Sequence, residues 1–209
     1  MMPQNSNLDL AHWHGLMQSF GFAENNIAYD RLIAAYSEKH RAYHTLEHIA
    51  ACFRHLDEVA SQLDRPHEVR LALWFHDVIY NPFSAKNEED SAQLAKEFLE
   101  LNQASADVTS RVEELIILTK EHSAPAGVDG QFMLDIDLSI LGTRPEIYAQ
   151  FEKDVRREYK RVPSFIFKKK RKEVLQGFLN RPRLYYTDYF FARLEARAKT
   201  NLSWAIEQL

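Results

Sequence analysis

The sequence contains little that would interrupt helices and almost no cysteine. Only 6 glycines and 7 prolines occur in 209 residues, which favours long helices over a turn-rich β fold. The single cysteine, Cys52, excludes an internal disulfide and a cysteine-rich zinc site, and it fits a reducing compartment. No stretch approaches the roughly 18 apolar residues that a membrane span needs, and the first residues lack the pattern of a signal peptide. We therefore expect a cytoplasmic protein without a membrane partner.

A strong charge of either sign is also lacking. The formal net charge is -4, which provides no field that would hold a nucleic-acid backbone. Residues 168–172 form a basic run, which we interpret as a solvated helix face from which Arg171 could turn inward. The expected partner is a small ligand rather than nucleic acid, and a homodimer stays open.

Apolar residues recur at spacings of three and four along most of the chain, the pattern of amphipathic helices. Thr45 is a good N-cap for one helix, and proline or glycine ends several others. The predicted helices cover residues 8–22, 27–36, 45–63, 67–80, 87–101, 108–119, 132–141, 145–161, 163–179 and 188–209. The pattern predicts an all-α fold, and 209 residues with 45% hydrophobic content fit one domain.

The pair His76-Asp77 lies in the apolar stretch from Trp74 to Tyr80. An aspartate is almost never fully buried unless it is paired or bound to a metal. If a helix continues through the pair, the two side chains point about 100° apart, so both can touch one ion over that surface. The alternative is a pair satisfied by backbone groups or by arginine.

Two other segments could complete a metal site. His44 and His48 are four residues apart, which places both imidazoles on one helix face if the helix extends to His44. Asp135 and Asp137 interrupt an apolar run, and at least one of them should face an ion. Imidazole with carboxylate suits Zn, Mn, Fe, Co or Ni and does not single out one of them.

His48, then His76-Asp77, then an aspartate about sixty residues later resemble the H…HD…D signature of the HD superfamily of metal-dependent phosphohydrolases. The likeness covers most of residues 40–209, and more narrowly the chain resembles an uncharacterised branch of predicted HD phosphohydrolases. The segments that carry it are RAYHTLEH, ALWFHDVIYNP, NEEDSA, LTKEH, LDIDLSILG, VRREYKRVP and NLSWAIEQL.

This resemblance implies a single HD-domain-like helical bundle over residues 1–209. Its core would span about 40–145, between an N-terminal helical pair and C-terminal helices. His48, His76, Asp77 and Asp137 would hold a divalent metal, with Asp135 as the alternative to Asp137 and with Mg as a further option for the ion.

The implied reaction is the attack of a metal-activated water on a phosphate ester or anhydride in a nucleotide or related small phosphorylated metabolite. A metal- and nucleotide-binding sensor without turnover and a di-iron oxygenase of the HD type are the alternatives.

Four more residues are candidates for substrate chemistry. Glu88 could orient the water or act as a general acid or base, and the alternative is that Asn87 and Glu88 cap a helix. Arg41, His44 and His122 are candidates for contacts with phosphate, because guanidinium and imidazole groups donate to phosphate oxygens. We assign catalytic roles to Glu88 and His44 and substrate binding to Arg41 and His122.

Overall fold

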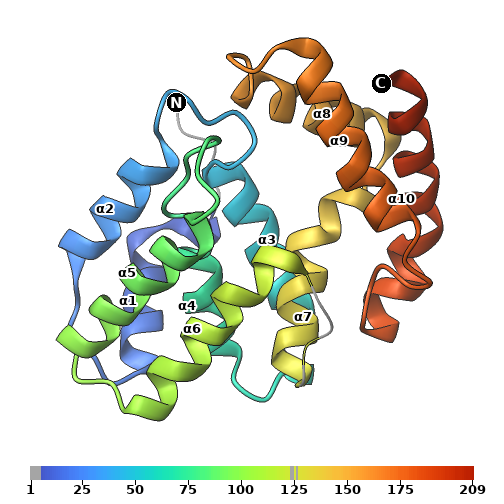
Figure 1. Cartoon of the computed structure of the whole chain (residues 1–209). Coiled ribbons are helices and arrows are strands. Elements are labelled where there is room, and N and C mark those ends of the chain that lie inside the picture. Colours follow the sequence, from blue (N-terminus) through green and yellow to red (C-terminus); the bar gives the residue numbers. More distant parts are fainter. Residues whose placement is uncertain (1–5, 123–124, 126) are drawn as a thin grey trace. The chain divides into compact units, whose positions relative to one another are not determined.

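The computed structural model describes residues 6–122, 125 and 127–209. In these residues it contains ten α-helices, three short 3₁₀ helices and no strand, which confirms the all-α prediction (Figure 1). None of these helices is both long and apolar enough to cross a membrane. The elements are η1 (Ser6–Leu8), α1 (Leu10–Ser19), α2 (Asn26–Tyr36), α3 (Leu46–Val59), η2 (Ala60–Gln62), α4 (Pro66–Phe75), α5 (Asn87–Leu101), α6 (Ala106–Glu121), α7 (Val128–Asp137), η3 (Leu138–Gly142), α8 (Pro145–Glu158), α9 (Ser164–Leu179) and α10 (Asp188–Gln208).

The chain divides into two compact units, residues 1–133 and 134–209, and the boundary falls inside α7. The prediction that residues 1–209 form a single domain stays a prediction.

Helix α4 is the centre of the first unit. It packs against α1, α3, α5 and α6, and α5 lies alongside α6 (Figure 1). All residues from Leu71 to Phe75 are buried, because α4 has neighbours on every side. The Trp74 ring forms T-shaped pairs with Trp13 and Phe53 at centroid distances of 6.0 and 5.2 Å. This aromatic core holds the end of α4 in place.

Helix α3 begins where the sequence predicts. The Thr45 side chain accepts a hydrogen bond from the Glu47 backbone N–H at 3.3 Å, so Thr45 is the N-cap and His48 lies in the first turn. The apolar face of α3 buries Ile49, Phe53 and other side chains against η1 and α4.

The predicted end of α4 is wrong. The helix ends at Phe75 rather than continuing to Tyr80, and His76 and Asp77 lie in the turn that follows. Carbonyl groups around this point are engaged by side chains from outside the helix: the Tyr36 hydroxyl donates to Trp74 O at 2.9 Å. His76 and Asp77 are therefore not two consecutive residues inside a helix, as the sequence predicts.

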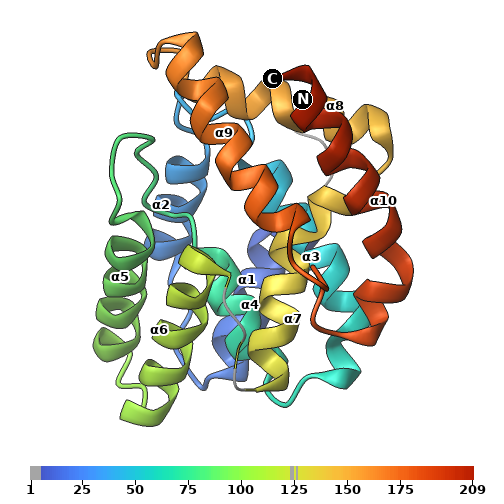
Figure 2. The same ribbon diagram turned by 45° about the vertical axis from the view of Figure 1, so that its right-hand side comes forward.

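In the second unit, α10 packs against η3, α8 and α9, and Figure 2 shows α9 running beside α10. Gly142 allows the close approach of η3 to α10, because an added Cβ would lie 2.5 Å from the Leu194 Cβ. Arg171 turns inward to form two hydrogen bonds with Glu152, while the neighbouring lysines are exposed. The interpretation of this run as a solvated helix face with an inward arginine is confirmed.

Candidate metal centre

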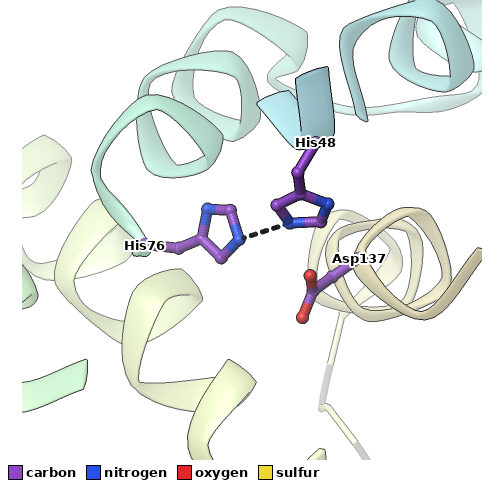
Figure 3. A group of neighbouring side chains, drawn as sticks. All are labelled: His48, His76 and Asp137. Atoms are coloured by element: carbon purple, nitrogen blue, oxygen red, sulfur yellow. Dashed lines mark hydrogen bonds between the residues drawn. The ribbon is translucent and has the colours of Figure 1, made fainter. Parts of the chain in front are cut away.

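Two buried histidines face each other in the first unit. His48 comes from the first turn of α3, and His76 is the C-cap of α4. Their Nε2 atoms are 3.2 Å apart, and the exposed fractions of the two residues are 6% and 1% (Figure 3). Two segments that are 28 residues apart in the chain therefore bring one nitrogen each to the same point.

The second nitrogen of each ring is held by a neighbour. His76 Nδ1 lies 2.9 Å from the Leu73 carbonyl, which can only accept, so Nδ1 carries a hydrogen and Nε2 of the neutral ring keeps its lone pair. His48 Nδ1 lies 3.0 Å from the Tyr43 hydroxyl, which can donate or accept. Such contacts orient a ligand ring and select its tautomer.

Asp77 adds a carboxylate to the same point. Its Oδ2 lies 3.1 Å from His76 Nε2 and 3.8 Å from His48 Nε2. The side chain is 17% exposed, so it is less buried than the apolar sequence around it predicts. Two imidazoles and one carboxylate thus converge within residues 48–77.

Asp137 is the last residue of α7 and is half-buried. One ligand atom from each of His48, His76 and Asp137 lies within 4.8 Å of the others, so this group could hold a metal ion (Figure 3).

Asp135, the alternative to Asp137, is engaged elsewhere. Its carboxylate accepts hydrogen bonds from the backbone N–H groups of Tyr186 and Thr187, each at 2.7 Å, and from the Thr187 hydroxyl at 2.6 Å. Burial raises the pKa of Asp135 to about 6, and these hydrogen bonds act in the opposite direction. Asp135 therefore ties α7 to the segment before α10.

No family model, curated protein or solved structure matches this chain.

His44 lies before the first residue of α3, so the condition under which His44 and His48 share a helix face is not met. Its ring stacks on Tyr80 at a centroid distance of 4.2 Å, and its centroid is 6.3 Å from that of His48. A catalytic role for His44 stays a prediction.

The side chain of Arg41 is fully buried, and its guanidinium donates to one carboxylate and three backbone carbonyls. These contacts indicate that the Arg41 guanidinium has a structural role within the chain. The prediction that Arg41 binds phosphate is not tested by them.

Glu88 and His122 lie at helix ends. Glu88 is half-buried in the first turn of α5. The neighbouring Asn87 does not cap this helix: it accepts from the Asn81 N–H and donates to the Asn81 carbonyl, both at 3.0 Å. His122 is the C-cap of α6 in the left-handed conformation, with φ of 47°. The roles predicted for Glu88 and His122 stay predictions.

Sequence reasoning missed Tyr43 and Cys52 as neighbours of His48. Cys52 Sγ lies 3.7 and 3.8 Å from the two ring nitrogens of His48. Cys52 follows His48 by four residues on α3, a spacing that could have indicated the contact. Tyr43 precedes the helix, and no periodic signal points to its position.

Proposed function

We propose that this chain is a metal-dependent phosphohydrolase that cleaves a phosphate ester or anhydride in a nucleotide or related small phosphorylated metabolite. The observation that supports the proposal is the convergence of His48 Nε2, His76 Nε2 and Asp77 Oδ2 within 3.8 Å of one another. The order of His48, His76-Asp77 and Asp137 in the chain resembles the H…HD…D signature, and this order supports the reaction class.

The donor set fits a divalent ion. A hydrogen on His48 Nε2 can bridge to His76 Nε2, with Tyr43 donating to His48 Nδ1. If an ion takes the place of that hydrogen, both Nε2 lone pairs can turn to it and the Tyr43 oxygen can accept from His48 Nδ1. The two states therefore differ in the tautomer of His48.

The residues that would hold the ion are His48, His76, Asp77 and Asp137. Mixed imidazole and carboxylate ligands favour Mn, Fe, Co, Ni or Zn over Mg, which prefers oxygen ligands. A bound divalent ion supplies a water of lowered pKa and neutralises charge on phosphoryl oxygens.

Other residues of this chain would act on the substrate. In our proposal Glu88 orients the attacking water, and His44 and His122 donate hydrogen bonds to phosphoryl oxygens. The half-buried positions of all three allow contact with a ligand from solvent.

The first experiment is elemental analysis of the purified chain, before and after reconstitution, with a phosphate-release screen over nucleotides and sugar phosphates. The screen uses Mn, Co, Ni, Mg and Zn, each with and without EDTA. We expect close to one or two ions per chain, and a loss of phosphate release of at least about 100-fold in Asp77→Ala and His76→Ala. His14→Ala, at a histidine outside the cluster, is the control and should keep wild-type turnover.

The failures can be told apart. No stoichiometric metal after reconstitution contradicts the proposed function altogether. Bound metal with tight nucleotide binding but no product means a sensor, and bound iron with oxygen consumption means an oxygenase.

A further inference from the structure

Arg41 joins the segment before α3 to the turn that follows α4. Its Nη1 donates to the carbonyl of Asp77 at 2.7 Å and to that of His44 at 3.2 Å, and its Nη2 donates to the carbonyl of Val78 at 2.8 Å. Its Nε donates to the Glu38 carboxylate at 2.9 Å. The side chain has no exposed surface. All three guanidinium nitrogens are therefore used within the protein.

Two tyrosines complete this arrangement. The guanidinium carbon lies 5.2 Å from the Tyr36 ring centroid and 5.4 Å from that of Tyr80, distances at which a cation is attracted to an aromatic face. The Tyr36 hydroxyl also donates to Trp74 O. Side chains from residues 36–41 thus engage the carbonyl of Trp74 in the last turn of α4 and the carbonyls of Asp77 and Val78 after it.

The carbonyls that Arg41 holds belong to the two segments that supply the histidines and Asp77 to the metal centre. Asp77 supplies a carboxylate to the cluster, and its own backbone carbonyl is held by Arg41. His48 stands four residues after His44, whose carbonyl the same guanidinium holds. One buried cation therefore links the backbone beside His48 to the backbone of the His76-Asp77 turn.

We propose that Arg41 is a positioning residue that sets the distance between His48 and the His76-Asp77 pair and so prepares the site for its ion. The inference rests on the proposed metal site and assigns Arg41 a role other than phosphate binding. Arginine suits the task because its planar fork can reach several carbonyls at once, whereas a lysine ammonium is a single point on a flexible stem.

A purely structural brace would stabilise the fold without tuning the metal ligands, so the test measures Mn²⁺ affinity separately from stability. The full-length wild type, Arg41→Met and Arg41→Lys are stripped with EDTA, dialysed and titrated with MnCl₂ by calorimetry. Urea unfolding of the metal-free proteins is followed in parallel. Losing a group that orients metal ligands typically costs 10-fold to 100-fold in affinity, and we expect a loss of about that size in Arg41→Met.

Arg111→Met is the matched control. Arg111 also donates two hydrogen bonds to a group on α4, the buried carboxylate of Glu68 near the start of that helix. Its loss should lower the urea midpoint but leave the dissociation constant for Mn²⁺ within about threefold of wild type, because Glu68 is far along α4 from His76.

The inference is overturned if folded Arg41→Met binds Mn²⁺ as tightly as the wild type, or if Arg111→Met loses affinity to the same extent. Should Arg41→Met fail to fold, the decisive variant is Arg41→Lys, because it keeps the charge but loses the planar guanidinium fork. Wild-type affinity for Mn²⁺ in Arg41→Lys would refute the inference. A wild type that binds neither Mn²⁺ in the titration nor any other ion on reconstitution refutes both this inference and the proposed function. A wild type that binds Mn²⁺ but releases no phosphate refutes only the latter.

Discussion

Two aspartates that are only two residues apart have different surroundings. Asp135 and Asp137 are equivalent in the sequence, since both interrupt the same apolar run. In the structure the Asp135 carboxylate is surrounded by donors from Tyr186 and Thr187, whereas a carboxylate oxygen of Asp137 belongs to the group with His48 and His76. A carboxylate with three hydrogen-bond donors has a structural use, and one beside two imidazoles has the chemistry of a ligand.

Substituting each aspartate separates these uses. Asp135→Asn exchanges one acceptor oxygen for an NH₂ group facing donors, and we expect it to lower the free energy of unfolding by about 1–3 kcal/mol while Mn²⁺ affinity stays near that of the wild type. Asp137→Asn should instead weaken Mn²⁺ binding by about tenfold or more with little change in the metal-free protein. Urea unfolding and calorimetric titration measure the two effects, and the reverse pattern would make Asp135 the ligand.

Some helices have the limits that local signals predict, whereas the helix predicted over 132–141 is α7, Val128–Asp137, followed by the 3₁₀ helix η3. Helix α3 begins after its predicted N-cap, and α5 covers the predicted residues 87–101. Helix α4 ends five residues early because Tyr36 and Arg41, both at least 36 residues away in the chain, bind carbonyls near its end. Helix propensity contains no information about such partners.

Helix α3 carries His48 in its first turn, so the N-cap of this helix, Thr45, should matter to the metal centre. Thr45→Ala removes the capping hydrogen bond, and we expect a loss of about 1 kcal/mol in the free energy of unfolding. If the first turn then frays, Mn²⁺ binding has to restore it. The same loss of about 1 kcal/mol then lowers the affinity for Mn²⁺ about fivefold.

Ser105→Ala is the control for this prediction, since Ser105 caps α6 in the same way. It should cost similar stability without changing Mn²⁺ affinity. Equal affinities in Thr45→Ala and Ser105→Ala would mean that the order of the first turn of α3 does not limit binding.

Acid should weaken the whole fold through at least one half-buried imidazole, that of His55. Burial lowers the pKa of His55 below its ordinary value of 6.5, Glu58 raises it and Arg54 lowers it. A histidine with a lowered pKa in the folded state stabilises the fold above pH 6.5. That contribution is lost as the pH falls, because the unfolded chain takes up the proton first.

We therefore expect His55→Gln to flatten the decline in the free energy of unfolding just below pH 6.5. The measurement is a series of urea unfolding curves of the whole chain at closely spaced pH values. His12→Gln, which removes an imidazole from an exposed side chain, is the comparison. A decline as steep as that of the wild type in His55→Gln would contradict the prediction.

The sequence by itself determined the all-α class, the position of nearly every helix and the residue types that can bind a metal. These properties depend on apolar periodicity, capping residues and side-chain chemistry, all of which are local. The tertiary structure was needed to establish that α4 ends at Phe75, that Tyr43 accompanies His48, and that Arg41 holds the turn of Asp77. These features depend on hydrogen bonds and contacts made by side chains after folding, and local periodicity does not encode such pairings.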